Sequence, residues 1–218
     1  MQSFRRQLLD RCLEDAALSM RGRVLDIGGV RTRKKGRFRP PLERVDSWQY
    51  LNLDSAAEPD YLCSAEDIPL ADGSVDTVVM TEVLQYLERP EAVVQQVHRV
   101  LAADGVCLAS SPFMFAAHGD DHVDRRRFSA VGLRELFGGA GFASIDVQAM
   151  GSVGSTTHDL LHVALGYAHP KESSLTRRAL RRLVRRCEPL FRRIDRLTEA
   201  QSRYVTTGHF IVARKSES

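Results

Sequence analysis

The chain has 218 residues, of which 43% are hydrophobic and 27% charged, an ordinary composition for a globular protein of one domain. No stretch approaches the roughly 18 consecutive apolar residues of a membrane-spanning helix, and the N-terminus lacks the pattern of a signal peptide. From Lys171 onward there are 13 Lys and Arg against 5 Asp and Glu, a net charge of +8. Since the whole chain has a net charge of +3, the first 170 residues carry −5. This asymmetry indicates a distinct basic element at the C-terminal end.

Strand-like runs alternate with helical runs through residue 150, which predicts an α/β fold, doubly wound around a mostly parallel sheet. The run RTRKKGRFRPPLERVDS, residues 31–47, contains a Gly and a Pro pair that forbid a long helix, so a short helix or an irregular loop is expected there. The predicted helices span residues 3–19, 91–101 and 130–137, and the predicted strands span 23–27, 48–53, 60–63, 75–80, 105–113 and 143–150.

The pattern changes after Gly151. Apolar residues then recur at spacings of three and four, with arginines on the other face, which predicts basic amphipathic helices broken at Pro189. We expect a single domain with a core over 21–150, a helical insertion over 151–203 and a last strand within 204–215. The insertion is expected to cap the substrate pocket; pairing with a second subunit and contact with an anionic membrane surface are the alternatives.

The stretch VLDIGGV, residues 24–30, predicts a buried strand that runs into a glycine turn, the place where open α/β sheets bind ligands. The dinucleotide pattern GxGxxG fails, since Val30 follows Gly28 and Gly29. Asp26 would place a carboxylate close to a pyrophosphate, so a cationic ligand without phosphate, such as S-adenosylmethionine, suits this turn better. Asp54, at the end of the next strand, can accept both hydroxyls of an adenosine ribose.

The stretch CSAEDIPLADGSVDTVVMTEVLQYL, followed by ERPEAVVQQVHRVLAADGVCLAS, resembles the class I S-adenosylmethionine-dependent methyltransferases, in particular the methyltransferase type 11 family. The likeness covers roughly residues 23–150, and several motifs agree in order and spacing. It implies a Rossmann-like sheet whose last strand is antiparallel, with S-adenosylmethionine as the cofactor. The cofactor-binding residues that it implies are Asp26, Gly28, Gly29, Asp54, Ser64, Ala65, Glu66 and Thr81.

Two positions depart from the family pattern. Val30 stands where a glycine is usual, and Gly29 can supply the flexible backbone instead. Ser64 replaces the usual Asp before the adenine loop, and its hydroxyl can still hydrogen-bond the adenine amino group.

The segment SSPFMFAAHGDDHVDRRRFS follows the fifth strand at the same sheet edge. His118 or His122 could remove a proton from the acceptor, with Asp121 orienting the ring, and Arg125 to Arg127 could bind an anionic substrate group. In the alternative interpretation the polar residues satisfy backbone groups of the loop, with Asp124 or Ser129 capping the next helix, and the arginines form a solvated face. Glu82 and Tyr86, after the fourth strand, are expected to line the cofactor pocket or to pack.

Other chemistry-bearing residues carry weaker signals. His158 and His162 have the spacing of two metal ligands on a helix, but no third ligand is evident, so no metal is expected. The basic run RTRKKGRFR could contact phosphates or form a solvated loop. The four cysteines lie far apart without a CxxC pair, which favours a reducing cytoplasm.

The favoured function is S-adenosylmethionine-dependent O-methylation of a small molecule or glycan intermediate by a cytoplasmic enzyme. An anionic substrate and a homodimer are further expectations. An RNA methyltransferase, suggested by the arginine clusters, is the first alternative, although the chain has MTEV where such enzymes carry an aromatic motif after the fourth strand. A non-catalytic protein that binds S-adenosylmethionine is the second alternative.

Overall fold

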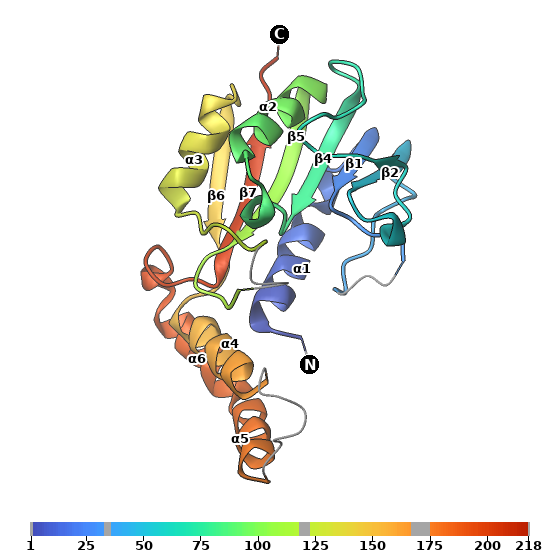
Figure 1. Cartoon of the computed structure of the whole chain (residues 1–218). Helices are drawn as coiled ribbons and strands as arrows, with labels where there is room; N and C mark the ends of the chain where they lie inside the picture. The colour runs from blue at the N-terminus through green and yellow to red at the C-terminus, as the bar shows by residue number, and fades with distance from the viewer. Residues whose placement is uncertain (1, 33–35, 118–122, 167–174, 218) are drawn as a thin grey trace.

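A computed structural model describes residues 2–32, 36–117, 123–166 and 175–217. Its centre is a seven-stranded sheet with the order β3-β2-β1-β4-β5-β7-β6 (Figure 1). The strands are β1 Arg23–Ile27, β2 Ser47–Asn52, β3 Tyr61–Leu62, β4 Val75–Thr81, β5 Leu101–Pro112, β6 Ser144–Ala149 and β7 Gly208–Arg214.

Strand directions in this sheet confirm the expected Rossmann-like architecture. The strands from β3 to β5 are parallel, whereas β7 runs antiparallel to both β5 and β6. Asp26 on β1 lies in register with Tyr50 on β2 and with Val79 on β4. The carboxyl ends of β1, β2 and β4 therefore meet at one edge of the sheet, where such folds bind ligands.

Helices cover both faces of the sheet. They are α1 Phe4–Ala16, α2 Pro90–Val100, α3 Ala130–Gly139, α4 Val153–Gly166, α5 Leu175–Arg186 and α6 Glu188–Leu197, with short 3₁₀ turns at 17–19, 55–57, 84–86 and 199–201. Successive strand residues point to opposite faces. Val78 thus joins a core with α2 and α3, while its neighbour Val79 joins the core beneath Leu9 and Leu13 of α1.

Most predicted elements are confirmed within a few residues. Strand β5 begins at Leu101, four residues before the predicted start, and the described part of the stretch 31–46 contains no helix or strand, as the Gly and Pro pattern predicts. The basic helices are divided as predicted, since α5 ends at Arg186 and Pro189 lies in the first turn of α6. Cysteines 12, 63, 107 and 187 are free.

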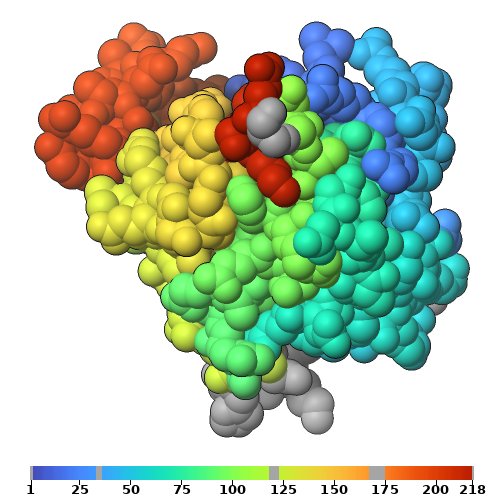
Figure 2. Space-filling model, turned by 90° about the horizontal axis from the view of Figure 1, so that it is seen from above, coloured from blue at the N-terminus to red at the C-terminus, as the bar shows by residue number. Residues whose placement is uncertain are grey.

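The insertion between β6 and β7 is attached to the core through α1. The carboxylate of Asp159 on α4 accepts hydrogen bonds from the backbone N–H groups of Phe4 (2.7 Å) and Arg5 (2.8 Å) at the start of α1. A carboxylate at a helix N-terminus satisfies unpaired donors and complements the helix dipole. In Figure 1, α5 and α6 extend away from the sheet, and seen from above the orange and red residues form a lobe at one side (Figure 2). No helix in the described ranges is long and apolar enough to cross a membrane.

Candidate active site

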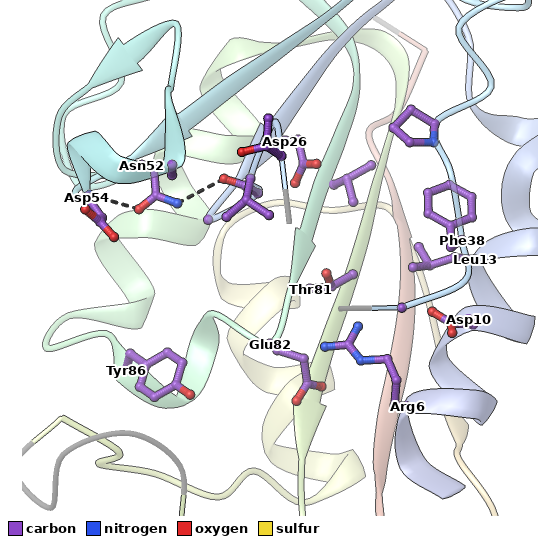
Figure 3. A pocket seen from close by; sticks show the side chains of 18 of the residues that line it. Arg6, Asp10, Leu13, Asp26, Phe38, Asn52, Asp54, Thr81, Glu82 and Tyr86 are labelled. Atoms are coloured by element: carbon purple, nitrogen blue, oxygen red, sulfur yellow. Dashed lines mark hydrogen bonds between the residues drawn. The ribbon is translucent and has the colours of Figure 1, made fainter. Parts of the chain in front are cut away.

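A cavity of about 730 Å³ opens at the carboxyl ends of β1, β2 and β4 (Figure 3). Helix α1, the glycine turn after β1, the loop after β2 and the loop after β4 contribute to its wall. Phe38 and Pro40 from the irregular loop close one side. Five of the eight predicted cofactor residues line this cavity, namely Asp26, Gly28, Gly29, Asp54 and Thr81.

Both glycines of the turn are required by local geometry. Gly28 adopts φ +76°, which disfavours any residue with a side chain, and its N–H donates to the Leu51 carbonyl at 2.8 Å. A Cβ atom at Gly29 would overlap the carboxylate of Asp26. Gly29 therefore permits the close approach of backbone to Asp26, and Val30 is accommodated in the cavity wall.

Asn52, at the end of β2, joins the two ligand-binding loops. Its side-chain nitrogen donates to the Gly29 carbonyl at 2.9 Å, and its side-chain oxygen accepts from the Asp54 N–H at 3.0 Å (Figure 3). Asp54 in turn accepts from the Ala56 N–H through Oδ1 at 2.9 Å. Sequence analysis missed Asn52, although a polar residue two positions before the strand-end acid was a usable signal.

Helix α1 contributes charged groups that the sequence did not place in the site. Asp10 is only 4% exposed; its Oδ2 accepts from the Arg37 N–H at 2.7 Å, while its buried Oδ1 has no partner in the part of the chain that the structure describes. The guanidinium of Arg6 points into the cavity (Figure 3). Burial lowers the pKa of Arg6, and nearby Asp10 partly opposes this effect. The cavity thus presents a buried acceptor beside a cation.

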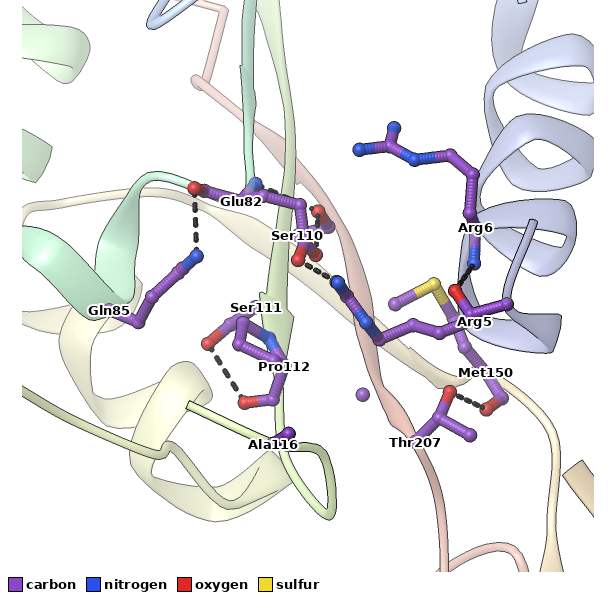
Figure 4. A network of polar contacts seen from close by, with 12 residues as sticks. Arg5, Arg6, Glu82, Gln85, Ser110, Ser111, Pro112, Ala116, Met150 and Thr207 are labelled. Atoms are coloured by element: carbon purple, nitrogen blue, oxygen red, sulfur yellow. Dashed lines mark hydrogen bonds and ion pairs between the residues drawn. The ribbon is translucent and has the colours of Figure 1, made fainter. Parts of the chain in front are cut away.

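The loop after β4 confirms the expected placement of Glu82 and Tyr86, since both line the cavity. Glu82 adopts φ +59°, and its carboxylate forms an ion pair with Arg5 and accepts from Ser110 Oγ at 2.9 Å (Figure 4). Its backbone N–H donates to the Ser110 carbonyl at 3.1 Å, and its carbonyl accepts from Gln85 Nε2 at 2.8 Å. These contacts fix the conformation of the loop beside the cavity.

Arg5 is the buried partner in this network. It is 5% exposed, and desolvation lowers its pKa to about 10. Its guanidinium also lies 4.3 Å from the centroid of the Phe115 ring, a cation–π contact.

Three predicted adenine-loop residues lie outside the wall of this cavity because the structure commits them to other contacts. Ser64 Oγ accepts from the Glu66 N–H at 3.2 Å. Ala65 packs in the core below α2, and Glu66 Oε2 accepts from Arg89 Nε at 3.0 Å. Their role at an adenine stays a prediction.

The predicted catalytic residues His118, Asp121 and His122 lie outside the described residues. The neighbouring arginines make contacts within the protein, and their role at an anionic substrate group stays a prediction. Arg125 Nη2 lies 2.5 Å from Glu88 Oε1, Arg126 Nη2 donates to the Glu88 carbonyl at 3.0 Å, and Arg127 Nη2 lies 2.8 Å from Asp124 Oδ2. Ser129 caps α3 by accepting from the Gly132 N–H at 3.1 Å.

His158 and His162 lie on α4 with their rings stacked, the centroids 6.1 Å apart. His158 Nδ1 lies 3.1 Å from Asp159 Oδ1, and that carboxylate caps α1. Within the described ranges, no group of three or more His, Cys, Asp or Glu side chains is arranged to hold a metal ion.

The described part of the basic run RTRKKGRFR is held by local contacts. Arg31 Nη2 bonds Asp60 Oδ1 at 2.8 Å, and Arg39 Nη1 donates to the carbonyls of Gly36 (2.7 Å) and Phe38 (2.8 Å). Residues 33–35 of this run lie outside the described residues.

Comparison with known proteins agrees with this architecture. A family profile described as a methyltransferase domain matches residues 43–109. A malonyl-[acyl-carrier protein] O-methyltransferase of Laribacter hongkongensis is 38% identical over 79 residues, which span 36% of this chain and only 25% of that protein.

Solved structures with the same fold cover nearly the whole chain. The [4+2]-cyclase SpnF aligns with a TM-score of 0.60 at 17% identity, covering 97% of this chain and 82% of SpnF. A SAM-dependent methyltransferase of Archaeoglobus fulgidus aligns with a TM-score of 0.58 at 16% identity, covering 96% of this chain and 94% of the other. At such identities these likenesses establish the fold.

Proposed function

Since residues 43–109 match the family profile of a methyltransferase domain, we propose that this chain is an S-adenosylmethionine-dependent methyltransferase. The observation that carries the proposal is the cavity at the carboxyl edge, where Asp26, the Gly28–Gly29 turn and Asp54 converge. The fold alone does not decide the reaction, because one structure with this fold is described as a cyclase.

The charges of the cavity fit this cofactor better than a dinucleotide. S-adenosylmethionine carries a sulfonium, an ammonium and a carboxylate, and it has no phosphate. Asp26 and Asp10, whose buried Oδ1 has no partner among the described residues, supply negative charge near the glycine turn. A pyrophosphate there would be repelled by both carboxylates.

Each charged group in the wall then has a role in binding. Asp54 would accept hydrogen bonds from the ribose hydroxyls of the cofactor. Asp26 and Asp10 would face its sulfonium and ammonium groups, and Arg6 would bind its carboxylate. When bound, the cofactor supplies a methyl group on a positively charged sulfur. The Arg5–Glu82 pair and the Asn52 hydrogen bonds hold the surrounding loops in position, which is the main contribution that a methyl-transfer site makes.

For the acceptor, we propose an oxygen of a small anionic molecule, with a glycan intermediate as the other candidate. The support is the relative from Laribacter hongkongensis, whose name describes O-methylation of a malonyl group. A carboxylate acceptor is already deprotonated at neutral pH, so its methylation needs no general base. A hydroxyl acceptor would need one, and His118 or His122 with Asp121 are the candidates. We place the reaction in a reducing compartment, in agreement with the free cysteines.

The test has two stages. Titration calorimetry with S-adenosylmethionine, S-adenosylhomocysteine and NAD should show binding of the first two only; binding of NAD instead would overturn the assignment. Transfer of labelled methyl groups is then measured on a panel of carboxylic acids, glycans and tRNA. Labelling of tRNA would favour the RNA methyltransferase alternative, and cofactor binding without any transfer would favour the non-catalytic one.

A further inference from the structure

Helices α5 and α6 expose a row of leucines. Leu180, Leu183, Leu190 and Leu197 are 43%, 56%, 55% and 75% exposed. Leu180 and Leu183 are three residues apart on α5, and Leu190 and Leu197 are seven residues apart on α6, so each pair lies on one face of its own helix. We call these four residues the leucine stripe.

Arginines border this stripe. Residues 175–197 contain nine Arg and only two acids, Glu188 and Asp195. Both acids are engaged within the protein: Glu188 Oε1 lies 2.8 Å from Arg192 Nη2, and Asp195 Oδ1 accepts from Ser152 Oγ at 2.9 Å. The outward surface of the helix pair is therefore strongly positive.

Exposed arginines stand next to individual leucines. Arg186 follows Leu183 by three residues, and Arg193 follows Leu190 by three. Residues three apart are neighbours on a helix surface, so each guanidinium lies beside a leucine of the stripe.

Helices α5 and α6 do not contribute to the wall of the cavity. No residue of α4, α5 or α6 in the described ranges lines it, so the expected cap is not seen there. The pair is instead supported by α4: Arg181 Nε donates to the Leu165 carbonyl at 2.5 Å, and the Phe191 ring packs 5.3 Å from that of His158. The two helices that carry the leucine stripe thus pack on α4 and extend away from the sheet (Figure 1).

We propose that the leucine stripe and its arginines dock on the surface of an anionic lipid bilayer. A bilayer offers both complements at once, an apolar layer for the leucines and phosphate groups for the guanidiniums. In a dimer formed through this surface, the arginines of one copy would face the arginines of the other, which is electrostatically unfavourable. A nucleic acid would match the arginines and leave the four leucines in water.

The test measures sedimentation of the full chain with vesicles. Binding is expected to vesicles of phosphatidylcholine mixed with phosphatidylglycerol, to weaken as salt is added, and to be absent with phosphatidylcholine alone. Arg186→Gln with Arg193→Gln should weaken binding roughly 25-fold, since each arginine near an anionic surface contributes roughly fivefold. Leu183→Ser with Leu190→Ser should weaken it as well.

The matched control is Leu18→Ser with Arg11→Gln, two exposed positions on the N-terminal helical segment, and it should bind vesicles like the unchanged protein. All variants should keep their circular dichroism spectra and their cofactor affinity, because none of these residues lines the cavity. The result is thereby independent of the proposed methyl transfer.

A second readout reports the contact itself. The chain has one tryptophan, the buried Trp48. In Leu190→Trp, the added indole should shift its emission to the blue with anionic vesicles only. The proposal would be overturned by equal binding to neutral vesicles or by arginine variants that bind anionic vesicles unchanged. It would also be overturned by a dimer that dissociates in the leucine variants, or by tighter binding to single-stranded RNA through the same arginines.

Discussion

Arg5 of α1 and Glu82 after β4 form a buried ion pair that joins the N-terminal helix to the edge of the sheet where the cavity opens. Both side chains are held by further contacts, Arg5 by the Phe115 ring and Glu82 by Ser110. Since Asp159 caps the same end of α1, the position of this helix couples the cavity wall to the insertion.

Glu82→Gln should destabilise the protein by about 3 kcal/mol, because it removes the ion-pair partner of the buried Arg5 cation. Urea unfolding monitored by circular dichroism measures this loss. The matched control is Glu88→Gln, which removes the partner of the exposed Arg125 and should cost less than about 1 kcal/mol. Equal costs for the two substitutions would show that the buried pair contributes no more than a surface pair.

Gly29→Ala should weaken S-adenosylmethionine binding, because the added Cβ would displace the Asp26 carboxylate. Gly139→Ala, where a Cβ has no heavy atom within 4 Å, is the control and should bind normally. Calorimetry on both variants checks the prediction. Normal binding by Gly29→Ala would mean that the position of Asp26 is not critical for the ligand.

Asp54→Asn should lower cofactor affinity by roughly 1 to 3 kcal/mol through the loss of charge-assisted hydrogen bonds to the ribose. The substitution retains a side-chain oxygen to accept from the Ala56 N–H, so the loop conformation should survive. Binding of 5′-methylthioadenosine, which keeps the ribose, should weaken in parallel. An unchanged affinity would remove Asp54 from the site.

Arg6→Met should weaken binding of S-adenosylmethionine and have a smaller effect on 5′-methylthioadenosine, which lacks the carboxylate. Methionine preserves much of the aliphatic bulk of the side chain and removes its charge. A matched comparison is Arg11→Met on the exposed part of the same helix. Equal losses for the two ligands would place Arg6 away from the carboxylate.

His209 should make stability depend on pH. Burial, followed by the positive charge of Arg134, lowers its pKa from 6.5 to about 4, and its Nδ1 is buried without a partner in the described residues. The unfolded chain therefore binds the proton more tightly than the folded chain does. The contribution of neutral His209 to the stability of the folded protein is complete above pH 6.5 and is lost as pH falls toward 4. Between pH 7.5 and 4.5 the loss is roughly 2 to 3 kcal/mol. His209→Gln should lose correspondingly less stability over this range; an identical pH dependence in both proteins would contradict the shift.

Local sequence signals determined much of the fold. Short apolar runs specified β1 and β4, the Gly28–Gly29 pair marked the turn, and Pro189 divided the basic helices. These features depend on backbone conformation and on which face each residue presents, and both are fixed by near neighbours. The acids Asp26 and Asp54 could be placed for the same reason, since each stands at the end of a parallel strand.

Tertiary structure decided which distant residues complete the site. The docking of α1 brought Arg6 and Asp10 to the cavity, and the packing of the loop after β3 engaged Ser64 and Glu66 elsewhere. Hydrogen bonds and ion pairs between distant segments depend on where helices pack, and helical periodicity does not report that position. The sequence alone thus determined the strands, the turn and the two acids, whereas the charge balance of the cavity followed from the packing of one helix against the sheet.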